Sequence, residues 1–166
     1  MKYRNLLILF AFIFFSSNSM ANSPKTIGKY KNWESFSLQT EKGKVCFAQT
    51  IPSKRVPENL KRDDSRLFVA FRPSESIRDE VSVTSGHEYK ASSVTAKSGK
   101  SSFSFFSQGK FAWLLDTNEE KKIIKLMKRA TNLMIIANTK KGAQTTDHYS
   151  MMGFTKAYNT AKKYCG

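Results

Sequence analysis

The sequence predicts an α+β, β-rich fold: a single domain of six to eight mostly antiparallel strands, in a sandwich or partly open barrel, with a short helix and a C-terminal helix. Three observations support this class. Short apolar runs ending at Pro, Gly or polar residues recur along the chain, helical periodicity is confined to two segments in its last third, and no repeat divides residues 22–166. A chain of this length can bury a sizeable core.

Alternation and turn residues define the strands. They are predicted at residues 44–52, 67–73, 79–86, 102–107, 110–115, 133–137 and 143–150. Pro52 ends the first of them, because proline cannot donate a backbone hydrogen bond. Gln108-Gly109 separates two strands closely enough to predict a hairpin with a tight turn. The polar segments 53–66 and 90–102 are predicted to be loops.

Two segments show helical spacing. Thr117 is predicted to cap the short helix, with Glu120 reaching back to it in a capping box. The apolar faces comprise Ile123, Ile124 and Met127 in the short helix and Phe154, Ala157, Tyr158, Ala161 and Cys165 in the C-terminal one. Gly153, at the corner before the last helix, is expected to be needed for backbone conformation or close packing.

The N-terminus has the pattern of a secretory signal peptide. Lys2 and Arg4 precede an apolar run of ten residues, Leu6 to Phe15, and Ser19-Met20-Ala21 supplies the small residues of a cleavage site. The alternative is a membrane anchor, but the run is half of the roughly 20 residues needed to span a bilayer. The sequence therefore predicts a signal peptide at 1–21, a domain at 22–166 with no transmembrane segment, and a periplasmic or secreted location.

The chain is strongly basic. Its 28 Lys and Arg outnumber 13 Asp and Glu, and the formal net charge of +15 falls to +13 when Lys2 and Arg4 are removed. The lysines are dispersed, which is typical of a solvated surface. Arg-rich patches with interleaved aromatics, which favour nucleic-acid binding, are missing from the sequence. The partner expected from the charge is an anionic envelope surface or another envelope protein.

Cys46 lies in an early predicted strand and Cys165 on the apolar face of the last helix. Two cysteines in an exported chain favour an intrachain disulfide, and two separate buried thiols or an intermolecular bridge are the alternatives. The Cys-x-x-Cys spacing of redox-active pairs is not present. The predicted role of the Cys46–Cys165 pair is structural.

Neither a catalytic residue nor a metal or cofactor site is predicted. Asp147-His148-Tyr149 suggests a catalytic arrangement, but adjacent strand residues point to opposite faces, so Asp147 cannot easily orient His148. Gly-x-Ser-x-Gly and His-Glu-x-x-His motifs do not occur. The alternative is a small periplasmic enzyme with an unrecognised site near His87, His148 and Tyr149.

One aromatic residue is a candidate for an exposed contact. In the segment SFSFFS, Phe106 points outward if Phe103 and Phe105 face the core. An apolar contact through Phe106 and ordinary edge packing are both open, since single exposed apolar residues are normal.

The chain resembles the invasion-associated locus B family. The resemblance rests on the segments KNW, VCF and FAWLL and, most specifically, on a C-terminal strand that leads into a helix and a terminal cysteine. The matching residues are Trp33, Cys46, Trp113, Asp147, Tyr149, Ser150, Gly153, Phe154, Ala157 and Cys165. It covers most of 30–166, is strongest over 111–165 and is weak over 53–100. Met151 departs from the leucine more usual in the family.

The resemblance implies an exported protein of a Gram-negative bacterium. The family is named for a virulence-associated member linked to host-cell entry, and most members have no defined biochemical activity. It therefore implies a non-enzymatic periplasmic or envelope-associated protein that binds an envelope component or, in a pathogen, contributes to host-cell interaction. The motif residues are expected to be structural.

Overall fold

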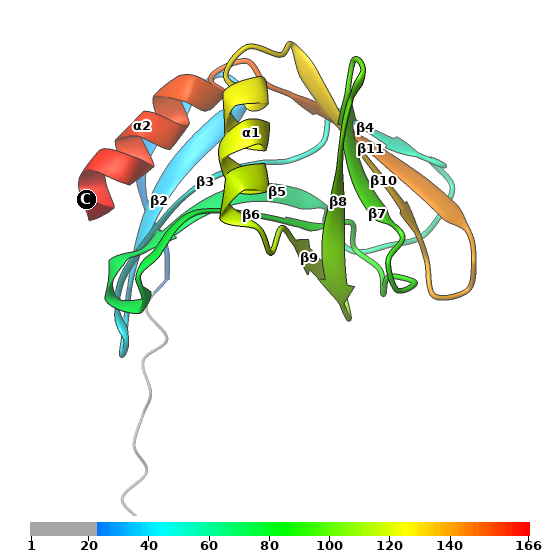
Figure 1. The fold of residues 1–166 in the computed structure, drawn as a ribbon, viewed down its shortest axis with the longest axis horizontal. Helices are drawn as coiled ribbons and strands as arrows, with labels where there is room; N and C mark the ends of the chain where they lie inside the picture. Colours follow the sequence, from blue (N-terminus) through cyan, green and yellow to red (C-terminus); the bar gives the residue numbers. More distant parts are fainter. Residues whose placement is uncertain (1–22) are drawn as a thin grey trace, which may run out of the picture.

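The backbone of the computed structural model forms one open, curved sheet whose eleven strands are all paired antiparallel; the structure describes residues 23–166 (Figure 1). The strands are β1 (Lys25–Tyr30), β2 (Trp33–Thr40), β3 (Gly43–Thr50), β4 (Lys54–Val56), β5 (Arg66–Arg72), β6 (Ile77–Thr84), β7 (Val94–Ser98), β8 (Ser101–Gln108), β9 (Phe111–Trp113), β10 (Asn132–Asn138) and β11 (Gln144–Ser150). The helices are α1 (Thr117–Met127), α2 (Phe154–Cys165) and the short 3₁₀ helix η1 (Pro73–Glu75).

The strand order is β1-β2-β3-β5-β6-β9-β8-β7-β10-β11-β4. The predicted β-rich α+β class and both predicted helices are confirmed. The predicted signal peptide, residues 1–21, lies outside the described residues. Within them, neither helix is long and apolar enough to cross a membrane.

Four strands were not predicted: β1, β2, β4 and β7. Their sequences are rich in Lys, Ser and Thr and show weak apolar alternation. They form because neighbouring strands satisfy their backbone hydrogen-bonding groups. β7, for example, pairs with β8 on one side and β10 on the other, and buries Val94 and Ala96. The predicted loops 53–66 and 90–102 are therefore wrong where β4 and β7 interrupt them.

The core lies between the inner face of the sheet and the two helices, which Figure 1 shows on the same side of the sheet. Trp33 and Phe154 are fully buried and their ring centroids lie 4.7 Å apart. The indole Nε1–H of Trp33 donates to the Ser150 carbonyl over 2.9 Å, and the Ser35 hydroxyl donates to the Ala157 carbonyl over 2.8 Å. Trp33 and Ser35 therefore attach α2 and the end of β11 to β2.

Gly153 starts α2 in the left-handed region, with a φ of 97°. A Cβ at this position would lie well inside contact distance of the Tyr30 carbonyl. Both reasons expected for a glycine at this corner, conformation and close packing, therefore apply.

The last turn of α2 lies against β3. Cys165 Sγ is 2.05 Å from Cys46 Sγ, the distance of a disulfide, and their Cα atoms are 5.8 Å apart. The described chain contains no free cysteine. The structure thus pairs the two cysteines as predicted, and Cys46 itself is completely buried.

The predicted cap of α1 is wrong by one residue. Asp116, not Thr117, is the N-cap, and its carboxylate accepts from the backbone N–H groups of Asn118 and Glu119. Glu120 does not reach back to the helix start; its side chain is buried instead. The Asp-x-x-Glu spacing at 116–119 fits an N-cap as well as Thr-x-x-Glu does, and the aspartate is the residue that precedes the helix.

The environment of Glu120 disfavours its negative charge. Burial, and then the nearby carboxylates of Glu80, Asp79 and Asp116, raise the pKa of Glu120 to about 7, although a hydrogen bond with the Val81 backbone opposes the shift. An unfolded glutamate has a pKa near 4.5. The folded protein therefore binds a proton that the unfolded chain releases between these values.

We expect Glu120→Gln to remove a loss of stability at high pH. The contribution of protonated Glu120 is fully present below pH 4.5 and is lost as the pH rises through about 7. At pH 8 the variant should exceed the original protein by about 1–2 kcal/mol in the free energy of unfolding, and at pH 4.5 the two should be similar. Urea unfolding at both pH values measures the difference. Glu119→Gln is the control, because Glu119 is partly exposed and pairs with Lys122, and an equally pH-dependent gain in that variant would contradict the assignment to Glu120.

Candidate functional site

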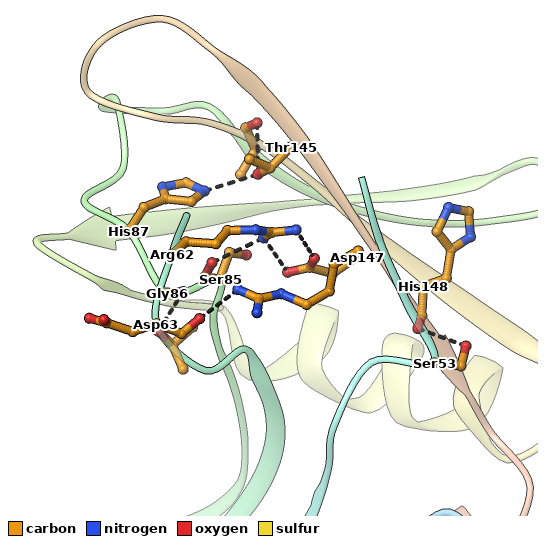
Figure 2. Close-up of polar contacts among 12 residues, drawn as sticks. Ser53, Arg62, Asp63, Ser85, Gly86, His87, Thr145, Asp147 and His148 are labelled. Carbon is orange, nitrogen blue, oxygen red and sulfur yellow. Dashed lines mark hydrogen bonds and ion pairs between the residues drawn. The ribbon is translucent and has the colours of Figure 1, made fainter. Parts of the chain in front are cut away.

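A buried ion pair lies at one end of the sheet, beneath a group of loops. Asp147 is on the inner face of β11, and Arg62 comes from the segment between β4 and β5. Arg62 Nη2 and Nη1 donate to the two carboxylate oxygens of Asp147 over 2.6 and 3.0 Å, and the two side chains are 1% and 0% exposed. This bidentate geometry connects the segment 57–65 to the core (Figure 2).

The same arginine also contacts the end of β6. Arg62 Nη1 donates to the Ser85 carbonyl over 3.0 Å. One residue further on, the Asp63 N–H donates to the Gly86 carbonyl over 2.9 Å. Gly86 has a φ of 73°, and a Cβ there would collide with the Asp63 backbone. The segment 57–65 is therefore held closely against 85–87.

His87 lies next to this pair and is half-buried. Its Nε2 is 2.9 Å from Thr145 Oγ1 on β11, and its Nδ1 is 3.1 Å from the Glu88 carbonyl (Figure 2). Burial, and then the positive charges of Arg62 and Arg55, lower the pKa of His87, although Asp147 and the Glu88 carbonyl oppose the shift. The imidazole is therefore predominantly neutral at pH 7.

Of the three residues of the hypothetical enzyme site, His148 lies apart from the other two. His148 is on the outer face of β11, opposite the face that carries Asp147 and Thr145, and Figure 2 shows its ring directed away from His87. The hydroxyl of Tyr149 is buried, and it has no hydrogen-bond partner among residues 23–166. Burial, and then the charge of Asp147, raise the pKa of Tyr149 well above its usual range. The expectation that Asp147 does not orient His148 is confirmed.

Four segments that are distant in the sequence converge above the ion pair: 60–63, 86–90, 108–110 and 138–143. Backbone hydrogen bonds connect Tyr89 to Gly109 (2.9 Å), Lys90 to Asn138 (2.8 Å) and Lys140 to Glu88 (2.9 Å). We call the lysines they carry the basic rim. It comprises Lys61, Lys90, Lys110, Lys140 and Lys141, all of them exposed.

Three lysines of the basic rim line a hollow of about 430 Å³. Its wall includes Lys61, Lys140 and Lys141, together with His87 at its buried side. Two of the five lysines form ion pairs: Lys140 with Glu88 at 3.2 Å and Lys110 with Asp63 at 2.6 Å. Lys61, Lys90 and Lys141 form no ion pair with any described residue. The rim therefore retains positive charge that is open to an anionic partner.

The sequence did not identify the basic rim or the ion pair. Arg62 belongs to a polar segment predicted to be a surface loop, and the five lysines are separated by up to 80 positions. The only signal was Asp147 itself, an acidic residue on the buried side of an alternating strand, which requires a cationic or hydrogen-bonding partner. The partner could not be chosen without the fold.

Phe106 and Trp113 lie on the outer face of the sheet. Phe103 and Phe105 are buried as predicted, while Phe106 is 48% exposed and its ring centroid is 5.3 Å from that of Trp113. Trp113, expected to be structural, is thus only partly buried.

In the part of the chain that the structure describes, no group of three or more His, Cys, Asp and Glu could hold a metal ion.

Comparisons of the chain with models of protein families, with curated proteins and with solved structures find no match.

Proposed function

We propose that this chain is an exported, non-enzymatic, envelope-associated protein of the invasion-associated locus B type that binds an anionic envelope component through the basic rim. The single observation that carries the binding site is the convergence of five lysines on four adjoining segments, with Lys61, Lys140 and Lys141 lining one hollow. A cysteine pair at disulfide distance is compatible with an oxidising compartment, and the N-terminal pattern supports export.

The charge of the rim suits a phosphate-bearing surface. Lysine ammonium groups act as separate point charges and do not provide the bidentate geometry of arginine. Such a set favours several phosphates spread over a surface, like those of anionic lipid headgroups, over one tightly held phosphate. Each lysine close to an anionic membrane contributes about 1 kcal/mol, and this attraction falls off within a Debye length of about 10 Å at 0.1 M salt.

A non-enzymatic role is favoured by the position of His148, on the face of β11 opposite Tyr149 and opposite Thr145, the partner of His87. His87 is held by Thr145 and a backbone carbonyl, and His148 faces the opposite side of the sheet. His87 instead supplies a neutral, partly buried wall to the hollow, beside lysines that carry the charge.

We expect the protein to bind phosphatidylglycerol vesicles at low salt and to be released by about 0.3 M salt, because screening weakens surface attraction. Replacing Lys61, Lys90 and Lys141 with Glu should weaken this binding at least about tenfold. These lysines form no ion pair with a described residue, and the change reverses the charge at all three positions. Vesicle sedimentation at several salt concentrations measures the change. Phosphatidylcholine vesicles, which are neutral, should not bind.

The matched control replaces Lys25, Lys42 and Lys100 with Glu. These lysines are exposed, form no ion pair with a described residue and lie outside the rim. The change in net charge equals that of the rim variant. If both triple variants lose binding equally, the attraction comes from total charge and not from the rim. If neither loses binding, or if the original protein does not bind, the proposal is wrong.

A further inference from the structure

An aromatic row crosses the outer face of the sheet, on the side opposite the helices. It comprises Phe36 on β2, Phe47 on β3, Phe68 on β5, Trp113 and Phe111 on β9, and Phe106 on β8. All six are partly or largely exposed, with Phe106 at 48% and Phe111 at 57%. The inward neighbours of these residues, such as Cys46, Val69 and Phe105, are buried in the core.

Strand register produces the row. Phe36 is directly opposite Phe47, and their rings stack with centroids 5.2 Å apart. Phe47 and Phe68 lie diagonally across β3 and β5, with ring centroids 6.2 Å apart. Phe68 is opposite Ser82 on β6, and Ser82 is opposite Trp113.

Trp113 is in turn opposite Phe106, which completes the row across six neighbouring strands. Because adjacent strands lie about 4.8 Å apart, the row extends over roughly 24 Å. Ser82 on β6 separates Phe68 from Trp113, so the row offers two groups of ring surfaces in line and not a broad apolar patch.

Polar groups and paired charges lie beside the row. Charged residues that flank the row on β1, β2, β5 and β6 are held in ion pairs: Lys29 with Glu34 at 3.2 Å, Arg66 with Asp64 at 2.9 Å, and Arg72 with Glu80 at 2.7 Å. Next to Trp113 and Phe111 lies a hollow of about 440 Å³, whose remaining wall is Glu80, Ser82 and Gln108. Ring faces thus adjoin a carboxylate, a hydroxyl and an amide.

We infer that the aromatic row binds a neutral β-1,4-linked polysaccharide chain, lying across the strands with one end in the hollow beside Trp113. Such chains are flat ribbons whose sugar rings present C–H groups to an aromatic face and hydroxyls at their edges. The line of rings matches the C–H faces, and Gln108, Ser82 and Glu80 match the hydroxyls. Single-stranded nucleic acid would also stack on rings, but it requires cations along its backbone, and the cations that flank these rings, Lys29, Arg66 and Arg72, are paired.

This site is separate from the basic rim and responds differently to salt. The test uses the complete protein in about 0.5 M salt, where attraction to the rim is strongly screened. The probes are the β-1,4-linked hexamers of glucose and of N-acetylglucosamine. Trp113 reports binding through its fluorescence, whereas Trp33 is fully buried and contributes a constant background.

We expect at least one hexamer to bind and to change the tryptophan fluorescence in high salt. Phe106→Ala and Phe111→Ala, which alter half-exposed rings and leave the core intact, should each weaken binding about fivefold to tenfold, as for aromatic residues that carry much of a contact. Tyr164→Ala is the control, because Tyr164 is 45% exposed on α2 and lies outside the row. It should leave the affinity unchanged.

Several results would overturn the inference. They are failure of both hexamers to bind, equal binding by the row variants and Tyr164→Ala, or binding that disappears in high salt together with vesicle binding. Self-association of the protein that Phe106→Ala and Phe111→Ala abolish, without sugar binding, would assign the row to a second copy of the chain instead. Loss of vesicle binding in the lysine variants with retained sugar binding would leave this inference intact.

Discussion

Asp147→Ala should lower the free energy of unfolding by about 3–5 kcal/mol, because it leaves the Arg62 guanidinium buried without a counter-charge. The two side chains are 1% and 0% exposed, so water cannot replace the lost carboxylate. Arg62 would retain only its hydrogen bond to the Ser85 carbonyl. The segment 57–65, which carries Lys61 of the basic rim, should then detach from the core.

Urea unfolding followed by circular dichroism measures this loss. Asp64→Ala is the matched control, because Asp64 also pairs with an arginine, Arg66 at 2.9 Å, but is 79% exposed. An exposed pair contributes about 0–1 kcal/mol, so the control should remain close to the original protein. Replacing Arg62 and Asp147 together with Met and Leu should recover much of the loss, since no uncompensated charge remains.

Equal stabilities of the Asp147→Ala and Asp64→Ala variants would show that the buried pair contributes no more than a surface pair. A double replacement no better than Asp147→Ala would show that the ion pair itself, and not the uncompensated charge, carries the stability. The two outcomes separate the value of the pair from the cost of breaking it.

Removal of the Cys46–Cys165 cross-link should lower stability by about 4–5 kcal/mol in the chain-entropy model, because the bond closes a loop of 119 positions in the unfolded chain. A local effect should accompany the global one. Cys165 is the last residue of α2, and Phe154, Ala157, Tyr158 and Ala161 must hold the helix on the sheet without it. The final turn of α2 should fray first.

The experiment compares the original protein with Cys46→Ser/Cys165→Ser, each unfolded in urea with and without reductant. Reductant should shift the midpoint of the original protein toward that of the double variant and should not affect the variant. Intact-mass measurement without reductant should find no free thiol. Two alkylatable thiols in the exported protein, or a urea midpoint of the original protein that reductant does not change, would contradict the prediction.

Much of the fold followed from local patterns. Short apolar runs that end at Pro, Gly or polar residues located β3, β5, β6, β8, β9, β10 and β11, and spacings of three and four located both helices. Cys165 was placed on the inner face of α2 because it shares a helical face with Phe154 and Tyr158. Likewise, Asp147 and His148 had to face opposite sides of their strand. Each of these results depends on residues close together in the sequence.

Tertiary structure decided the rest, because the interactions concerned join residues that no local pattern relates. The polar strands β1, β2, β4 and β7 exist through pairing with neighbours. Glu120 and Arg62 look like surface residues in the sequence, and only the packing of other elements around them makes them buried. The basic rim and the aromatic row depend on loop convergence and strand register, respectively. The sequence by itself thus determined which apolar residues face inward along the predicted elements. Which of them meet was decided by the order of the strands in the sheet, because that order brings distant segments together.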